Sequence, residues 1–226
     1  MKKGMFYAVG VGPGDPELLT VKAVRILREA DVIAVPDRGT GEQTALQIAK
    51  DYVQGKQLLF CPTPMIRDRE KLDRGYDAVA DRIAALLDTG NAVAMITLGD
   101  PTVYSTAVYV FDRLRDRGYE TEIVPGVPSF CACAARLGQS LCERSQRLTV
   151  IPGSADTADV TALSGTRVVM KSGKELLTLQ SQLRNSGLLE RACAVTNCGM
   201  EGERLWERFG DMEEPAGYFT VVIVKD

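Results

Sequence analysis

The sequence alternates short apolar, β-branched runs with longer amphipathic segments, and this alternation constrains the fold more than any other feature. Such alternation is typical of βα units and mainly parallel sheets. The predicted strands are residues 6–11, 31–36, 57–61, 92–98, 121–124, 148–151, 167–170, 193–197 and 218–224. One predicted helix begins at Asp15 and another begins beyond residue 68. The other predicted helices lie near residues 42–52, 105–117, 129–137 and 174–186. We therefore predict an α/β protein.

The chain has 226 residues, which suits one large domain or two compact ones. Its later part is richer in predicted strands, and no long linker separates it from the earlier part. We place the change near residues 118–122. This predicts an N-terminal α/β domain over residues 1–119 and a C-terminal α/β domain over residues 120–226.

The sequence contains no histidine. This excludes histidine as a general base, Ser-His and Cys-His nucleophile pairs, and zinc sites that need imidazole. Chemistry in this chain must therefore come from carboxylates, amines, hydroxyls, thiols, the backbone or a cofactor.

The net charge of −3 argues against non-specific nucleic-acid binding. No apolar run is long enough to span a bilayer, and the N-terminus lacks a signal-peptide pattern, so we expect a cytoplasmic protein. The six cysteines show no metal-site or disulfide spacing, which favours buried small apolar side chains over metal ligands. Cys131 and Cys133 should point to different sides of a helix.

The segment Gly10-Val11-Gly12-Pro13-Gly14-Asp15 follows the first predicted strand. It misses the dinucleotide fingerprint, because the third glycine of Gly-x-Gly-x-x-Gly would fall at Asp15, and Pro13 removes an N–H group that could bind phosphate. Two alternatives stay open: a tight turn between strand and helix, capped by Asp15, or a loop shaped to lie against a ligand.

Two further turns follow predicted strands: Leu98-Gly99-Asp100-Pro101 and Pro125-Gly126-Val127-Pro128-Ser129. Open α/β sheets bind ligands at the carboxyl ends of their strands, and Ser129 could cap a helix there. Each turn alone could be a simple corner. Three such turns together favour a shared cleft.

Arg67, Arg69, Lys71 and Arg74 form the densest basic cluster and alternate with acidic residues. Such alternation usually marks a solvated helix face with internal ion pairs, and the alternative is a clamp for an anion. Lys171 follows an apolar strand and is either a surface lysine or a residue that points into a cleft.

These runs together resemble the tetrapyrrole methylase family over essentially the whole chain. The resemblance rests on Gly10–Thr20, Leu98–Pro101 and Val124–Val127. Residues 64–72, 99–106 and 127–130 are similar to the precorrin-2 C20-methyltransferase branch of cobalamin biosynthesis, which methylates precorrin-2 or its cobalt complex with S-adenosylmethionine.

The resemblance implies two α/β domains with the active-site cleft between them, a homodimer, and conversion of S-adenosylmethionine to S-adenosylhomocysteine. Carried over by position, the cofactor-binding residues would be Pro13, Leu98, Gly99, Asp100, Val103, Ser129, Phe130 and Met170, with Asn197 and Thr220 matched less closely.

The implied chemistry suits a chain without histidine. The sulfonium is already activated and the reduced macrocycle is an electron-rich carbon nucleophile, so alignment within an enclosed cleft supplies most of the catalysis. Asp100 is the first candidate to assist loss of the C20 proton, with Tyr104 and Lys171 as orienting or charge-balancing candidates. The polycarboxylate substrate would contact Arg67, Arg69 and Lys71, and we expect no metal site built by the protein itself.

Three alternatives remain: another branch of the family acting elsewhere on the macrocycle or on a protein or rRNA, a non-catalytic tetrapyrrole-binding or carrier protein, and a nicotinamide oxidoreductase. Residues 39–45 favour the cobalt-containing route, although the sequence does not decide whether the substrate carries cobalt.

Overall fold

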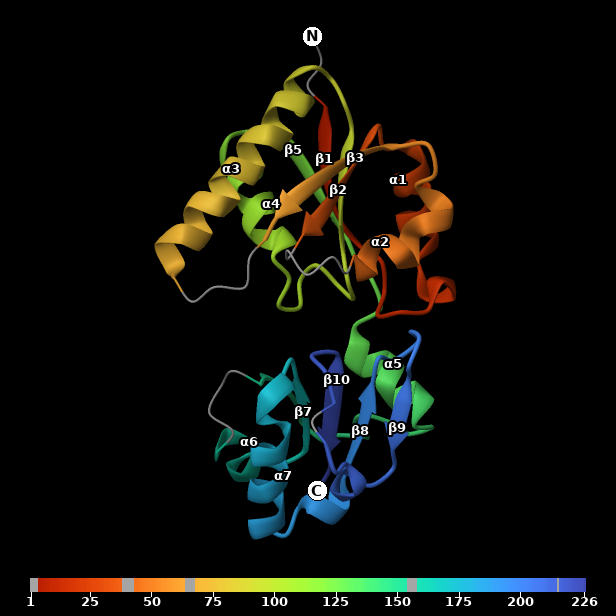
Figure 1. Cartoon of the computed structure of the whole chain (residues 1–226), viewed down its shortest axis with the longest axis vertical. Coiled ribbons are helices and arrows are strands. Elements are labelled where there is room, and N and C mark those ends of the chain that lie inside the picture. Colours follow the sequence, from red (N-terminus) through yellow and green to blue (C-terminus); the bar gives the residue numbers. More distant parts are fainter. Residues whose placement is uncertain (1–3, 38–42, 64–67, 154–157, 215) are drawn as a thin grey trace. The chain divides into compact units, whose positions relative to one another are not determined.

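The computed structural model describes residues 4–37, 43–63, 68–153, 158–214 and 216–226. Its contacts divide the chain into Met1–Pro128 and Ser129–Asp226, which we call unit 1 and unit 2. The division falls later than the 119/120 boundary expected from sequence, because the strand Glu120–Val124 pairs with the first strand of unit 1. The α/β class is confirmed (Figure 1).

Unit 1 contains a five-stranded parallel sheet in the order β3-β2-β4-β1-β5. The strands are β1 (Met5–Gly10), β2 (Val32–Asp37), β3 (Gln57–Pro62), β4 (Val93–Thr97) and β5 (Glu120–Val124). The helices are α1 (Val21–Glu29), α2 (Thr44–Ala49), α3 (Arg69–Asp88) and α4 (Ala107–Asp116). Because β4, β1 and β5 are parallel neighbours, the turns that follow them emerge at one edge of the sheet.

Both faces of the unit 1 sheet are covered, as Figure 1 shows. Helices α3 and α4 pack on one face around Phe6, Ile83 and Met95, and α1 and α2 pack on the other around Leu27 and Ile96. This burial explains why the strands read as nearly continuous apolar runs.

The first predicted helix is split into two elements. Asp15 accepts the Glu17 N–H at 2.8 Å but caps only a short 3-10 turn, Pro16–Leu18. Thr20 caps α1 by accepting the Ala23 N–H at 3.1 Å. The expectation that one helix runs on from Asp15 was therefore wrong, because the second cap begins a new helix.

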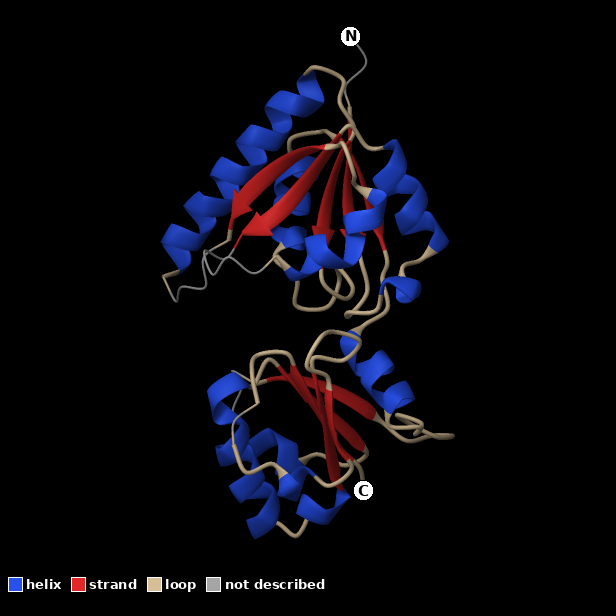
Figure 2. Ribbon diagram, turned by 45° about the vertical axis from the view of Figure 1, so that its right-hand side comes forward, coloured by secondary structure: helices blue, strands red, loops and turns tan. Residues whose placement is uncertain are grey.

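Unit 2 contains a mixed sheet in the order β6-β7-β10-β8-β9, in which only β6 and β7 are parallel. The strands are β6 (Leu148–Pro152), β7 (Thr166–Met170), β8 (Ala192–Thr196), β9 (Arg204–Trp206) and β10 (Thr220–Val224). The helices are α5 (Ser129–Arg136), α6 (Ala158–Ala162) and α7 (Leu176–Asn185). Figure 2 shows α6 and α7 on one face of this sheet and α5 on the other.

The cysteines are free thiols in both units. Cys61, Cys133, Cys193 and Cys198 are buried, whereas Cys131 and Cys142 are exposed. The opposite environments of Cys131 and Cys133 confirm that they lie on different sides of their helix. Among the described residues, no helix is long and apolar enough to cross a bilayer, and no cluster of acidic and thiol side chains has metal-binding geometry.

Candidate functional site

The three turns singled out in the sequence meet at one edge of unit 1. Gly12 and Gly99 form an antiparallel bridge, in which the Gly99 N–H donates to the Gly12 carbonyl at 2.7 Å and the reverse bond measures 3.3 Å. A Cβ placed on Gly126 would lie 2.2 Å from the Gly99 carbonyl oxygen and 2.9 Å from the Gly10 carbonyl carbon. The turns therefore pack backbone against backbone in unit 1, and the shared cleft expected from the sequence stays a prediction.

Asp100 joins two of these turns. It is 7% exposed. One carboxylate oxygen accepts the Gly126 N–H at 2.9 Å, and the other accepts the Thr102 N–H at 2.7 Å together with the Thr102 hydroxyl. A buried carboxylate with donors on both oxygens holds the β4 turn against the β5 turn.

A buried pair of hydroxyls supports the same edge. Thr97 Oγ1 and Ser105 Oγ lie 2.8 Å apart, and Ser105 also accepts the Ala107 N–H at the start of α4. The sequence analysis did not identify this pair. Its available signal was a threonine directly before Leu98 and a serine two residues before α4.

Backbone strain marks three of the predicted site residues. Outside glycine, the described residues adopt positive φ at four positions: Tyr104, Arg144, Lys171 and Asn197, at 49°, 50°, 62° and 51°. Left-handed conformations cost free energy for residues with a side chain and often occur at functional sites. Tyr104, Lys171 and Asn197 were chosen from motifs alone, so this strain is an independent observation.

Three predicted cofactor residues of unit 2 lie at one end of its sheet. Met170 ends β7 and pairs with Val221 of β10. Thr220 begins β10 and pairs with Thr196, and their hydroxyl oxygens lie 2.8 Å apart. Asn197 follows β8 and donates its N–H to the Phe219 carbonyl at 3.1 Å. The weaker sequence matches at 197 and 220 therefore lie beside the stronger match at 170.

Ser172 adds a polar atom at this end of the sheet. Its side chain is buried, and its hydroxyl has no hydrogen-bond partner within the described part of the chain. A Cβ on Gly153 would lie 2.2 Å from the Ser172 Cα, so the ends of β6 and β7 are packed closely. No sequence signal set Ser172 apart from an ordinary loop serine.

The remaining cofactor candidates are distributed between the units. In unit 1, Pro13 is buried, whereas Leu98 and Val103 are half-buried. In unit 2, Ser129 is the first residue of α5 and is half-buried, and Phe130 is 8% exposed.

The basic cluster lies at the start of α3. Asp68 caps this helix by accepting the Lys71 N–H at 3.1 Å, and its other carboxylate oxygen lies 3.4 Å from Lys71 Nζ. Arg74 pairs loosely with Glu70 at 3.9 Å. These exposed ion pairs contribute little energy, so they do not decide between a solvated helix face and a clamp for an anion.

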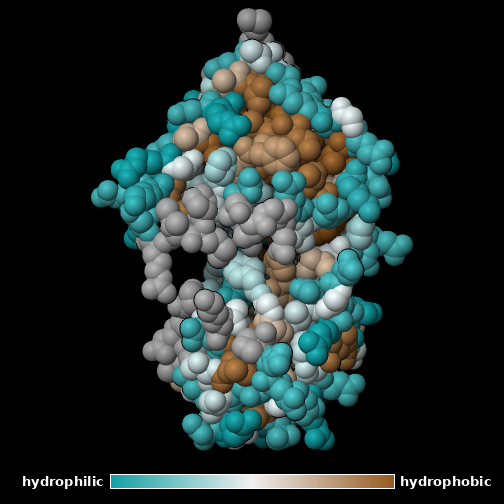
Figure 3. All heavy atoms as spheres, in the orientation of Figure 1, coloured by the Kyte–Doolittle hydropathy of each residue, from teal (hydrophilic) through white to brown (hydrophobic). Residues whose placement is uncertain are grey.

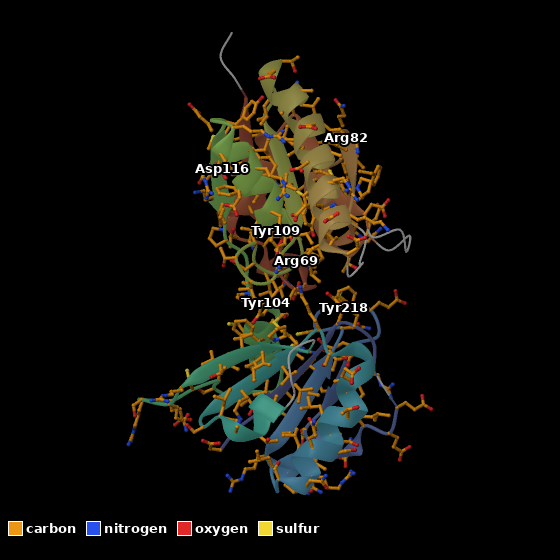
Figure 4. The ribbon with its side chains drawn as sticks, turned by 90° about the vertical axis from the view of Figure 1, so that its left-hand side faces the viewer. Arg69, Arg82, Tyr104, Tyr109, Asp116 and Tyr218 are labelled. Atoms are coloured by element: carbon orange, nitrogen blue, oxygen red, sulfur yellow. The ribbon has the colours of Figure 1, made fainter. Side chains whose placement is uncertain are left out.

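Arg69, which lies in the first turn of α3, is exposed; Figure 4 shows Arg69 and Tyr104 at the same end of unit 1. Arg67 lies outside the described residues, as does most of the 39–45 stretch.

The sequence of residues 5–213 matches the family model of the tetrapyrrole (corrin/porphyrin) methylases. The chain belongs to this family. A probable cobalt-precorrin-2 C(20)-methyltransferase of Methanocaldococcus jannaschii is 39% identical over 192 residues, or 82% of each chain. The cobalt-precorrin-2 C(20)-methyltransferase of Salmonella typhimurium is 34% identical over 98% of this chain and 96% of its own length. The precorrin-2 C(20)-methyltransferase of a Sinorhizobium species is 31% identical over 98% and 95%.

Solved structures of other tetrapyrrole methylases share the fold. A cobalt precorrin-4 methyltransferase superposes with a TM-score of 0.75 at 21% identity, covering 98% of this chain and 94% of its own. A uroporphyrin-III C-methyltransferase of Thermus thermophilus in complex with S-adenosylhomocysteine gives 0.72 at 23% identity, covering 99% and 98%. The predicted tetrapyrrole methylase fold is thus confirmed.

Proposed function

We propose that this chain transfers the methyl group of S-adenosylmethionine to C20 of precorrin-2 or its cobalt complex in cobalamin biosynthesis. The observation that carries the proposal is its similarity, at 31–39% identity over most of the chain, to relatives named for that reaction. The geometry adds support, because the turns expected to bind the cofactor pack together in unit 1.

The residues present fit S-adenosylmethionine chemically. Leu98 and Val103 in unit 1, and Phe130 and Met170 in unit 2, are apolar side chains of the kind that line adenine sites. The buried hydroxyl of Ser172, which has no hydrogen-bond partner among the described residues, can serve a ribose or amino-acid group. When bound, the cofactor supplies an electrophilic methyl group on a sulfonium.

In our proposal the chain contributes mainly position. Asp100 fixes the Gly99 and Gly126 turns, so its first role is to hold the shape of the cofactor edge. The oxygen that accepts the Gly126 N–H has a second lone pair, and Asp100 therefore remains our candidate to accept the C20 proton. Tyr104 and Lys171, held in left-handed conformations, are the candidates for orienting the macrocycle and balancing its charge.

The substrate carboxylates require local positive charge on an acidic protein. Arg69 and Lys71 lie in the first turn of α3, where the helix dipole also favours anions. We propose that they bind substrate carboxylates, together with Arg67 from the preceding segment. A clamp of this kind should act on the substrate KM and leave cofactor affinity unchanged.

We also propose a cytoplasmic homodimer, as the sequence resemblance implies. Edge strand β3 exposes Leu58 and Phe60, and Figure 3 shows hydrophobic residues gathered over this strand. A second copy covering this area would remove apolar surface from water. Light scattering of the purified chain measures the assembly, and a monomer at micromolar concentration contradicts it.

Anaerobic turnover of purified precorrin-2 tests the function. The expected product carries one additional methyl group. The reaction should consume one equivalent of S-adenosylmethionine and require no reduced nicotinamide. Running metal-free and cobalt-loaded substrate side by side decides which form is natural. Absence of methylation of both forms, with cofactor bound, would contradict the proposal and favour another substrate.

A further inference from the structure

In unit 2, helix α5 and the segment Asn197–Glu203 are joined at two points. Arg136 Nε donates to both carboxylate oxygens of Glu203, at 2.9 and 3.1 Å, and Arg136 Nη2 also donates to Glu203 Oε1. One helical turn earlier, the Cys133 thiol forms a hydrogen bond with Cys198. Because Cys133 and Arg136 are three residues apart, both contacts lie on one face of α5.

Glu203 also folds its own segment. Its Oε2 accepts the Gly199 N–H at 2.7 Å, and its N–H donates to the Met200 carbonyl at 3.2 Å. The Met200 N–H in turn donates to the Asn197 carbonyl at 2.8 Å. A single carboxylate, 15% exposed, therefore closes the segment on itself and ties it to α5.

Both partners of this connection carry proposed cofactor residues. Helix α5 begins with Ser129 and Phe130, and the joined segment begins with the left-handed Asn197. The hydrogen bond from Arg136 lowers the pKa of Glu203. Glu203 is therefore ionised at neutral pH, and a guanidinium is always protonated in this range.

We propose that the Arg136–Glu203 pair is a positioning brace that holds Asn197 in place relative to the first turn of α5, so that cofactor affinity depends on it. The inference rests on the proposed cofactor site. Preorganised ligand contacts bind more tightly because less ordering remains to be done on binding. Neither side chain touches the reacting atoms in this account, and both act through Asn197 and α5.

Calorimetric titration of the full chain with S-adenosylhomocysteine tests the brace. Glu203→Gln keeps an acceptor for the Gly199 N–H but removes the charge paired with Arg136, and the expected result is an approximately tenfold higher Kd. In turnover, KM for S-adenosylmethionine should rise similarly while kcat at saturating cofactor stays within about twofold. Arg136→Lys keeps the positive charge and should therefore lose less affinity for S-adenosylhomocysteine than Arg136→Gln.

The matched control is Glu29→Gln, which removes the partner of Arg25 in an exposed pair on α1 and should leave Kd unchanged. A double-mutant cycle of Glu203→Gln and Arg136→Gln should show coupling, because the second change removes nothing further. A Kd within twofold of wild type in a folded Glu203→Gln variant would overturn the brace alone. Failure of the wild-type chain to bind the cofactor would overturn the cofactor site and the brace together.

Discussion

The two units build their proposed cofactor edges in different ways. In unit 1, glycines at positions 10, 99 and 126 allow backbone to pack directly on backbone. In unit 2, the corresponding sheet end has one such close approach, Gly153 against Ser172, and adds side-chain contacts: the Thr196–Thr220 hydroxyl pair and the Arg136–Glu203 brace. The edge of unit 1, which we call the steric edge, should tolerate no added atom. The stability of the edge of unit 2, which we call the polar edge, should depend on charge and pH.

The largest effect is expected at the steric edge. Gly126→Ala would place a Cβ 2.2 Å from the Gly99 carbonyl oxygen, and backbone cannot move away as a flexible side chain can. We expect a loss of about 3 kcal/mol in the free energy of unfolding, measured by urea denaturation. The control is Gly75→Ala within α3, where nothing lies within 4 Å of the new Cβ; it should be stabilising by about 0.5–1 kcal/mol. Equal stabilities for both variants would contradict the steric account.

A smaller effect is expected at Asp100. Asp100→Asn turns one acceptor into a donor that faces the N–H of Gly126 or Thr102. We therefore expect the free energy of unfolding to fall by about 2 kcal/mol and the KM for S-adenosylmethionine to rise. Asp116→Asn, a change at an exposed carboxylate of α4, should stay within about 0.5 kcal/mol of wild type. A fall in kcat with stability and KM unchanged would leave catalysis as the only role of Asp100.

The polar edge should be sensitive to acid. The hydrogen bond from Arg136, assisted by the Gly199 N–H, lowers the pKa of Glu203, so its contribution to stability is complete above the ordinary glutamate pKa and is lost as the pH falls through the lowered value. The Tm difference between wild type and Glu203→Gln should therefore shrink between about pH 5 and pH 3. The difference caused by Gly126→Ala should persist over that range. A Glu203→Gln difference that is constant with pH would argue against a charged brace.

The smallest effect concerns thiol reactivity, with no change in stability. Iodoacetamide should modify the exposed Cys131 and Cys142 of the folded protein, as read by peptide mass spectrometry. Cys61 should resist, because burial raises the pKa of its thiol to about 11, and Cys133 should resist because the hydrogen bond to Cys198 and burial raise its pKa. All six cysteines should react in urea. Early labelling of Cys133 would show that α5 separates readily from its neighbours.

The sequence predicted the strands of unit 1 well because buried parallel strands are continuous apolar runs, as in Val93–Thr97. It missed β9, since Arg204-Leu205-Trp206 is too short to show a period, and it merged the 3-10 turn at Pro16 with α1 because both carry helix-start signals.

The candidate site likewise has features that the sequence predicted and features that it did not. Turns with proline and glycine after strands were visible as motifs, and the structure brings Gly12, Gly99 and Gly126 together. Arg136 and Glu203 are 67 residues apart, and no local pattern links two exposed-looking charges at that distance. Pairings of this kind depend on tertiary packing, which single-sequence patterns do not encode.

The position of the transferred methyl group tests the central claim most directly. Anaerobic incubation of the protein with precorrin-2, or its cobalt complex, and S-adenosylmethionine carrying an isotope-labelled methyl group gives a product whose labelled carbon can be assigned by NMR. Our account predicts a single labelled methyl group on C20. A label on any other macrocycle carbon would contradict it.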